Sequence, residues 1–456
     1  MHHRNRDRLT RISVFGLGRV GLVTAACFAK KGFQVVGIDT DRERLQLIHD
    51  LQSPFYEPKL DAYLRETVRK GNLRTTDKPE DISRTGLVYI AVGTPSSENG
   101  AIDLSQVRTA ATMIGRSMRN CGRFQTVVIK STVTPGTARQ VIKPILQQES
   151  DKSAGRGFGL VSNPEFLREG NAIRDTEHPD RIVIGSEHPA IISILETFYK
   201  KFHGARLPPV IRTTHENAEL IKYANNAYLA TKVSFINTIA CIAERIGNAD
   251  VSTVTKAIAT DARSRESHLS AGLGYGGPCL PKDLRAFIQT SRGLGYEPGL
   301  LKAVSDVNQR QPDKALGFAR RALRSIRDSR VAVLGLAFKP GTDEMREAVS
   351  ISIIKRLLLK GAKVIAYDPV ANKAAKKIFG DQIDYATDPR QCIKDADLAI
   401  IVTEWDVLKT LTPPEFFSLM RTPIVFDGRR IFDRTDMRTA GVDFSAVGLG
   451  PQSETF

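Results

Sequence analysis

Residues 12–39 read ISVFGLGRVGLVTAACFAKKGFQVVGID. The apolar run 12–15 predicts a strand, residues 22–31 predict a helix that ends at Gly32, and residues 34–39 predict a second strand. Further strands are expected at 87–92, 126–130 and 181–185. Because strands that alternate with helices form parallel sheets covered on both faces, we expect an α/β fold with a doubly wound, Rossmann-like sheet.

The turn after the first strand carries Gly16, Gly18 and Gly21 in a GxGxxG pattern. Alone, this pattern also fits a structural turn, but here the next strand ends in Asp39, whose carboxylate suits a ribose 2′-hydroxyl and repels a 2′-phosphate. Gly16 permits the tight turn, Gly18 lets a pyrophosphate approach the backbone, and Gly21 lets helix and strand pack closely. We therefore expect NAD as cofactor. The NAD contacts expected in this region are Gly16, Gly18, Val20, Gly21, Asp39 and Arg44.

The rest of the chain divides into a helical part and a partial repeat of the first part. Residues 214–247 contain almost no helix breaker and predict one long apolar helix, of the kind that lies between domains or subunits. From residue 330, a strand, a helix, Gly361 and a strand ending in Asp368 follow the order of the first part, without its second and third glycines. The expected domains are residues 1–206, 207–327 and 328–456.

A second glycine-rich stretch, GLGYGGPCLPKD, occupies residues 272–283. Its glycines let the backbone run close to a ligand, and their N–H groups can face anionic oxygens. Pro281 suits the first turn of a helix. A thiol at a helix N-terminus beside Lys282 has a lowered pKa and is nucleophilic, which makes Cys279 a candidate nucleophile and Asp283 a neighbour in the same site. The alternative is a glycine loop with an incidental cysteine.

Two further groups of polar residues have chemistry to offer. Lys222 and Asn226 are four residues apart on the long helix, so they share a face and can stabilise an oxyanion, although such residues also line helix surfaces. The stretch NPEFLREG, residues 163–170, contains Glu165 and Glu169, either of which can activate water or hold a hydroxyl. Without other evidence it also fits a solvated helix start.

The composition excludes several classes of protein. The 66 basic and 50 acidic residues give a net charge of +16, which favours anionic partners. The densest basic run, residues 320–330, resembles a solvated helix face more than a nucleic-acid patch, and no nucleic-acid motif accompanies it. Five scattered cysteines argue against a disulfide framework, and no metal-binding spacing occurs. No apolar run is long enough for a membrane span or a signal peptide, so we expect a cytoplasmic protein.

Together the motifs resemble the UDP-glucose/GDP-mannose dehydrogenase family over nearly the whole chain. The matching stretches are GLGRVG (16–21), VGTP (92–95), KSTV (130–133), NPEFLREG (163–170), ENAELIKY (216–223), GGPCLPKD (276–283) and FKP (338–340). This resemblance implies a four-electron oxidation of a sugar C6 hydroxyl with two NAD. Cys279 would form a thiohemiacetal and then a thioester, which water hydrolyses.

The resemblance also implies roles for individual residues. The implied catalytic residues are Cys279, Lys222, Asn226, Asp283, Glu165 and Thr132. The implied cofactor contacts beyond the glycine turn are Thr94, Pro95, Ser131, Thr132, Glu169, Lys282 and Arg346. The implied substrate contacts are Glu165, Phe166, Leu167, Lys222, Asn226, Ser270, Gly274, Tyr275, Gly276, Phe338, Lys339 and Arg429. Arg263 would reach in from a neighbouring subunit, so we expect a homodimer or higher homo-oligomer, with a nucleotide sugar as partner and neither nucleic acid nor membrane.

The tripeptide after Cys279, Pro281-Lys282-Asp283 with Leu280 between, favours oxidation of UDP-glucose to UDP-glucuronate over the N-acetylhexosamine branch. GDP-mannose is the alternative substrate, because enzymes that oxidise it share most of these motifs. A two-electron dehydrogenase of the 3-hydroxyacid type would have no use for Cys279. A non-catalytic NAD-binding protein would have no use for Lys222 or Asn226.

Overall fold

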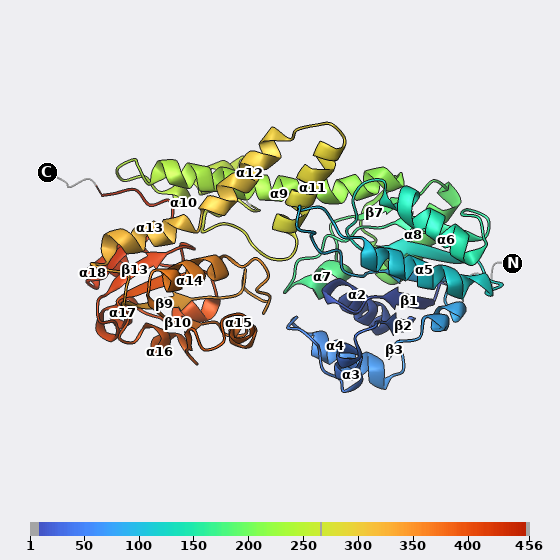
Figure 1. Ribbon diagram of the computed structural model, residues 1–456, viewed down its shortest axis with the longest axis horizontal. Coiled ribbons are helices and arrows are strands. Elements are labelled where there is room, and N and C mark those ends of the chain that lie inside the picture. Colours follow the sequence, from blue (N-terminus) through green and yellow to red (C-terminus); the bar gives the residue numbers. More distant parts are fainter. Residues whose placement is uncertain (1–8, 265–266, 453–456) are drawn as a thin grey trace. The chain divides into compact units, whose positions relative to one another are not determined.

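The computed structural model describes residues 9–264 and 267–452. Within them the chain forms two compact units, one ending at Asn225 and the other beginning at Asn226. Each unit contains its own β-sheet with helices packed against it (Figure 1).

The first unit is built on an eight-stranded sheet of order β3-β2-β1-β4-β5-β6-β7-β8, in which only the β6–β7 pair is antiparallel. Alternate residues of β4 enter separate cores, with Leu87 and Tyr89 on one face and Val88 and Ile90 on the other. The strands are β1 (Arg11–Phe15), β2 (Gln34–Ile38), β3 (Leu73–Thr76), β4 (Leu87–Ile90), β5 (Gln125–Ile129), β6 (Phe158–Ser162), β7 (Ile182–Gly185) and β8 (Val210–Thr213).

Both faces of this sheet are apolar, so helices must cover both, which confirms the predicted doubly wound α/β class. The helices are α2 (Arg19–Lys30), α3 (Arg42–His49), α4 (Leu60–Arg69), η1 (Pro79–Arg84), α5 (Ser105–Arg119), η2 (Ala138–Ile142), α6 (Lys143–Ser150), α7 (Ala172–Glu177), α8 (Pro189–His203) and η3 (Gly204–Arg206). The helix η2 is a π-helical turn that runs directly into α6.

The predicted long helix is present as α9 (His215–Ala243). It begins in the first unit and ends in the second. Four shorter helices follow in the second unit: α10 (Val251–Thr260), α11 (Leu280–Gly293), α12 (Gly299–Arg310) and α13 (Asp313–Ala322).

The second unit carries a six-stranded parallel sheet of order β11-β10-β9-β12-β13-β14. The strands are β9 (Arg330–Leu334), β10 (Lys363–Tyr367), β11 (Asp384–Tyr385), β12 (Leu398–Ile401), β13 (Ile424–Asp427) and β14 (Asp443–Ala446). The helices around it are α14 (Val349–Leu359), α15 (Asn372–Phe379), α16 (Pro389–Ile393), η4 (Asp406–Thr410), α17 (Pro413–Leu419) and α18 (Arg434–Thr439). This strand order is that of β3-β2-β1-β4-β5-β6, so the partial repeat in the sequence corresponds to a repeated fold.

An aspartate at the corresponding position supports the first turn in each of the two sheets. Asp39 accepts a hydrogen bond from the backbone N of Leu17 at 2.6 Å. Asp368 accepts from the backbone N of Leu336 at 2.8 Å and of Ala337 at 3.0 Å. Both carboxylates therefore hold the loop that follows the first strand of their sheet.

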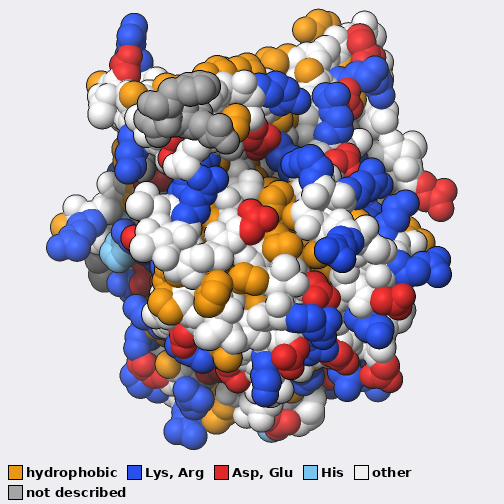
Figure 2. Space-filling model, turned by 90° about the vertical axis from the view of Figure 1, so that its left-hand side faces the viewer, with side chains coloured by type: hydrophobic (Ala, Val, Ile, Leu, Met, Phe, Trp, Pro, Cys, Tyr) orange, Lys and Arg blue, Asp and Glu red, His pale blue; other side chains and the backbone are white. Residues whose placement is uncertain are grey.

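The basic residues are dispersed. Figure 2 shows one face of the molecule, on which Lys and Arg side chains lie among acidic and apolar ones. In the run 320–330, α13 ends at Ala322, so Arg324 and Arg327 are exposed in the following loop and not on a helix face as expected. Within residues 9–264 and 267–452, no helix combines the length and apolarity that a membrane span requires.

Candidate active site

In the first unit, the glycine turn joins β1 to α2. Gly16 has φ +88°, and a Cβ there would lie 2.7 Å from the carbonyl oxygen of Ala91. A Cβ on Gly21 would lie 1.8 Å from the oxygen of Gly16, so the helix packs on the turn only with glycine at this position. A Cβ on Gly18 would meet nothing within 4 Å. The open side of Gly18 at the N-terminus of α2 fits a phosphate ligand.

Asp39 lies at the end of β2, where its carboxylate is buried and shared between three donors. Besides the Leu17 backbone it accepts from the backbone N of Asp41 at 3.0 Å and from Arg44 Nη1 at 2.8 Å. Arg44 also pairs with Asp41 at 3.1 Å, so its guanidinium is held over the end of β2. The sequence-predicted cofactor residues Asp39 and Arg44 therefore form one ion pair.

Glu165 and Lys222 form a buried ion pair in the first unit. Lys222 Nζ donates to Glu165 Oε1 at 2.9 Å, and the backbone N of Leu167 donates to Oε2 at 2.5 Å. Burial raises the pKa of Glu165, but the charge and hydrogen bond of Lys222 outweigh burial and leave the pKa below its ordinary value. The ammonium also lies 5.5 Å from the centre of the Phe166 ring.

The loop that carries Glu165 is fixed at its far end by residues from other elements. Glu57 accepts from the backbone N of Gly170 at 2.7 Å and of Ala172 at 2.8 Å. Arg168 makes a bidentate pair with Asp175, at 2.9 and 2.7 Å. These contacts make residues 163–170 a supported loop between β6 and α7, not a solvated helix start.

The remaining cofactor candidates of this unit lie on loops that follow β4, β5 and β6. Ser131 Oγ donates to the oxygen of Val92 at 2.7 Å, which ties the loop after β5 to the loop that carries the buried Thr94. Glu169 Oε1 lies 3.8 Å from Nε of Arg19, a residue of the glycine turn. Thr132 borders a small cavity beside Lys222.

In the second unit, Cys279 is the N-cap residue of α11, with Pro281 in the first turn as expected. The backbone N of Asp283 donates to the oxygen of Cys279 at 2.8 Å, so the helix starts at the cysteine. The buried Asp283 carboxylate accepts from Asn226 Nδ2 at 2.7 Å and from Lys282 Nζ at 2.6 Å. The structure thus brings three predicted site residues together beside Cys279.

The glycine loop before Cys279 is packed so closely that larger residues do not fit. A Cβ on Gly276 would lie 2.2 Å from the oxygen of Glu347. Gly277 has φ +84°, and a Cβ there would lie 2.6 Å from the Phe338 ring. The backbone N of Gly277 donates to the oxygen of Arg346 at 3.1 Å. Residues 338–347 of the C-terminal part therefore form one wall of the loop.

The other substrate candidates of this unit occupy different surroundings. Arg429 Nη2 donates to the oxygen of Gly274 at 3.4 Å, while Lys339 Nζ lies 5.7 Å from the centre of the Phe338 ring. Ser270 is exposed. Arg263 is exposed and paired with Asp261, and its role toward a neighbouring subunit stays a prediction. Among the described residues, no cluster of three or more His, Cys, Asp or Glu side chains is arranged to hold a metal.

Comparison with known proteins gives a family for the whole chain. Three models of the UDP-glucose/GDP-mannose dehydrogenase family match: the NAD binding domain at residues 10–203, the central domain at 216–310 and the UDP binding domain at 332–434. The chain belongs to the UDP-glucose/GDP-mannose dehydrogenase family.

Relatives and a solved structure agree with this membership. The UDP-glucose 6-dehydrogenase AglM of Haloferax volcanii is 42% identical over 96% of this chain and 99% of its own length. TuaD of Bacillus subtilis, also a UDP-glucose 6-dehydrogenase, is 40% identical over 96% and 93%. The structure of a UDP-glucose dehydrogenase from Pyrobaculum islandicum has a TM-score of 0.87 and 36% identity, covering 97% of this chain and 96% of that one.

Membership in the family confirms two sequence-based predictions, an NAD-dependent dehydrogenase and a nucleotide-sugar substrate. The open Gly18 turn, the N-terminus of α2 and the Asp39–Arg44 pair fit NAD. When bound, NAD would supply a hydride acceptor for a dehydrogenase reaction.

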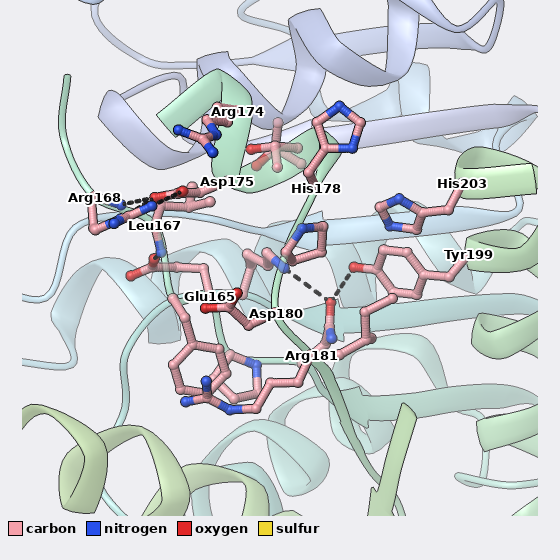
Figure 3. Close-up of a pocket in the computed structure, with 18 of the residues that line it drawn as sticks. Glu165, Leu167, Arg168, Arg174, Asp175, His178, Asp180, Arg181, Tyr199 and His203 are labelled. Atoms are coloured by element: carbon pink, nitrogen blue, oxygen red, sulfur yellow. Dashed lines mark hydrogen bonds and ion pairs between the residues drawn. The ribbon is translucent and has the colours of Figure 1, made fainter. Parts of the chain in front are cut away.

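Several polar residues of the first unit escaped sequence analysis. A pocket of about 170 Å³ is lined by Glu165 together with residues of neighbouring loops and helices (Figure 3). In it, Lys130 Nζ donates to Asn163 Oδ1 at 3.2 Å, and the Tyr199 hydroxyl donates to the same oxygen at 2.5 Å. Sequence analysis also missed Glu57 and Glu219, whose carboxylates each accept hydrogen bonds from two backbone N–H groups and so position loops of this unit. For Glu219, a charged residue on a mostly apolar helix was the available signal.

Proposed function

We propose that this protein oxidises the C6 hydroxyl of UDP-glucose to the carboxylate of UDP-glucuronate, in two oxidations that each consume one NAD. Cys279 would attack the intermediate aldehyde to form a thiohemiacetal, the second oxidation would give a thioester, and water would release the acid. The relatives named UDP-glucose 6-dehydrogenase support this substrate.

The observation that carries the proposal is the position of Cys279 at the N-terminus of α11, whose first turn also carries Asp283 with its Asn226 and Lys282 donors. A helix N-terminus and a nearby ammonium stabilise a thiolate. A simple two-electron dehydrogenase has no step that requires such a thiol.

Lys222 and Asn226 lie one turn apart on α9, and each is held by a carboxylate, Glu165 and Asp283 respectively. We propose that they stabilise the oxyanion that forms at C6 in the hemiacetal and in hydrolysis. Preorganised donors of this kind contribute about 10²–10³-fold to the rate. Asp283 would assist proton transfer at the reacting oxygen. Glu165 and Thr132 would place the hydrolytic water.

The substrate would lie along the glycine loop, with Tyr275, Phe338, Lys339 and Arg429 as contacts. Lys282 and Arg346 would face the cofactor.

The test is a stoichiometry measurement on the purified protein. With UDP-glucose and NAD we expect two NADH per sugar and UDP-glucuronate as product. In a C279S variant acid formation should stop, since a serine hydroxyl is a much weaker nucleophile than a thiolate and does not capture the aldehyde. If the protein turns over GDP-mannose but not UDP-glucose, GDP-mannose is the substrate and the proposal of UDP-glucose is wrong. Near-normal activity of C279S would refute the thioester route.

We also propose that residues 207–327 form a central dimerisation domain. Tyr228, Phe235 and Ile242 follow one another at seven-residue spacing on α9 and are 61%, 50% and 50% exposed in the single chain. Such a row lies on one helix face and calls for an apolar partner. A F235E variant should shift the protein toward monomers in sedimentation velocity, whereas K256E, on the exposed side of α10, should not.

A further inference from the structure

Two adjacent arginines follow β13, and their side chains contact different parts of the second unit. Arg429, one of the expected substrate contacts, donates from Nη2 to the oxygen of Gly274 in the glycine loop at 3.4 Å. Arg430, to which sequence analysis gave no role, donates from Nη2 to both carboxylate oxygens of Asp250, at 2.8 and 2.7 Å. The turn after β13 therefore contacts the glycine loop through one guanidinium and the start of α10 through the next.

The Arg429 guanidinium lies close against the glycine loop. A Cβ on Gly272 would lie 2.9 Å from its Nη1. Its Nε donates to the oxygen of Val402 at 2.6 Å and lies 3.3 Å from the Glu404 carboxylate. Because a guanidinium has five N–H donors, Arg429 can hold the loop and still offer donors to a ligand. Ligand binding therefore depends on the direction in which Arg429 leaves the turn.

The backbone of this turn is bent at Arg430. Arg430 has φ +60°, in the left-handed region that residues other than glycine rarely adopt. Such a conformation costs free energy and persists where surrounding contacts maintain it. The ion pair with Asp250 supplies one of these contacts. The Asp427 carboxylate supplies others, because it accepts hydrogen bonds of 2.7 to 2.9 Å from the backbone N atoms of Arg429, Arg430, Ile431 and Phe432.

Asp250 is a fixed anchor for the ion pair. It is the N-cap residue of α10, and its Oδ1 accepts from the backbone N of Ser252 at 2.7 Å. The neighbouring backbone is held by the C-terminal segment, since the backbone N of Val251 donates to the oxygen of Gly448 at 2.9 Å. The side chains of Arg430 and Asp250 are 16% and 34% exposed, so solvent screens the pair only in part.

The charges around the pair favour its present geometry. Burial lowers the pKa of Arg434, and the nearby charges of Arg438 and Arg430 lower it further, whereas Asp250 raises it. Arg434 is itself held by the oxygen of Gly450, to which its Nη2 donates at 2.5 Å. Without the Asp250 charge, Arg430 would lose its carboxylate partner and be repelled by Arg434.

We propose that Asp250 and Arg430 are positioning residues for the sugar nucleotide. Their ion pair holds the left-handed turn, and the turn directs the Arg429 guanidinium toward the glycine loop. Arg429 binds the substrate, and Asp250 acts only through it. This inference rests on the proposed function, in which Arg429 is a substrate contact.

The test separates the charge of Asp250 from its role as a helix cap. D250N keeps a good N-cap side chain and loses the charge, whereas D250E keeps the charge and loses the capping geometry. In D250N, the Kd for UDP-glucose in calorimetric titration and the KM for UDP-glucose should both rise about tenfold. The values of kcat and of KM for NAD should stay within about twofold of the wild type, because only substrate binding is weakened. D250E should bind UDP-glucose like the wild type.

A double-variant cycle tests whether Asp250 acts through Arg429. R429A should weaken UDP-glucose binding at least as much as D250N does, and D250N/R429A should bind within about twofold of R429A alone. The matched control is E415Q, which removes the charge of a carboxylate in the first turn of α17 that pairs with Arg390 at 2.6 Å. Its Kd for UDP-glucose should be unchanged.

The inference is overturned if D250N binds UDP-glucose within about twofold of the wild type, or if D250E is impaired and D250N is not. It is also overturned if the losses of D250N and R429A add in the double variant, or if D250N lowers kcat and the affinity for NAD as well, since both would indicate a general loss of structure. If D250N does not fold, R430Q serves instead, and a wild-type Kd for R430Q would overturn the inference. A wild type that neither binds UDP-glucose nor forms NADH with it would refute the proposed function itself, whatever the variants do.

Discussion

Replacing Lys222 by methionine should destabilise the first unit strongly. Lys222 is 4% and Glu165 7% exposed, and their charged atoms are 2.9 Å apart. The K222M variant removes the ammonium and leaves Glu165 buried without this partner. Removing one member of a buried pair costs about 3–5 kcal/mol. For a unit of this size, that corresponds to a fall in Tm of roughly 6–20 °C.

The pH dependence of Tm shows whether the unpaired Glu165 carboxylate causes the loss of stability in K222M. In the wild type the folded-state pKa of Glu165 lies below the ordinary value of 4.5, so the pair contributes stability above that pH and loses it as the pH falls. In K222M, burial without the ammonium raises the Glu165 pKa, so stability is lost as the pH rises. The difference in Tm between the two proteins should therefore be greatest near neutral pH and should shrink toward about pH 4.

Calorimetry of the wild type, K222M, E165Q and the double variant K222M/E165Q provides the assay. The double variant should recover most of the lost stability, because no unpaired charge remains. A K222M protein within about 1 kcal/mol of the wild type at neutral pH would refute the reasoning, as would a double variant that loses the sum of both single effects.

Three further outcomes follow from single contacts. A G276A variant should be destabilised by about 1–3 kcal/mol, because its Cβ would lie 2.2 Å from the Glu347 backbone oxygen. It should also lose sugar-nucleotide affinity in calorimetric titration. The control is G293A, where a Cβ meets nothing within 4 Å. Burial lowers the pKa of His215 from 6.5 to about 4, so the contribution of its neutral form to stability is complete above pH 6.5 and declines as the pH falls toward 4. In urea unfolding, the free energy of unfolding of H215Q should therefore fall less steeply over this pH range than that of the wild type. In a D39A variant, kcat/KM for NADP should rise by about tenfold, because Arg44 becomes free to bind the 2′-phosphate. An unchanged preference for NAD would show that the Asp39–Arg44 pair does not determine cofactor choice.

The parts of the fold that the sequence predicts are those with local signals. The strand, turn and helix at 12–31 follow from apolar periodicity and from glycines at positions where a Cβ would clash with the backbone. The start of α11 at Cys279 follows from Pro281. The partial repeat is readable because the same order of local signals occurs twice.

The contacts that complete the site are remote in sequence and leave no local signal. Glu219 binds Gly136, 83 residues away, and Glu57 binds Gly170, 113 residues away. Lys222 and Asn226 were predicted to share a helix face. That spacing does not reveal that one meets Glu165 and the other Asp283, since partner choice depends on how strands and helices pack.

The Asp368 carboxylate accepts five hydrogen bonds, from the backbone N atoms of Leu336, Ala337, Val370 and Ala371 and from the indole Nε1 of Trp405. The acid at the end of the second strand is thus present in a sheet without the glycine fingerprint, where its carboxylate holds backbone N–H groups and one indole of the same unit. A motif search that counts this acid as a ribose ligand would assign two dinucleotide sites to a chain with one fingerprint. In proteins with duplicated sheets, the middle glycine, with its unfilled side, is the more discriminating mark of a bound nucleotide.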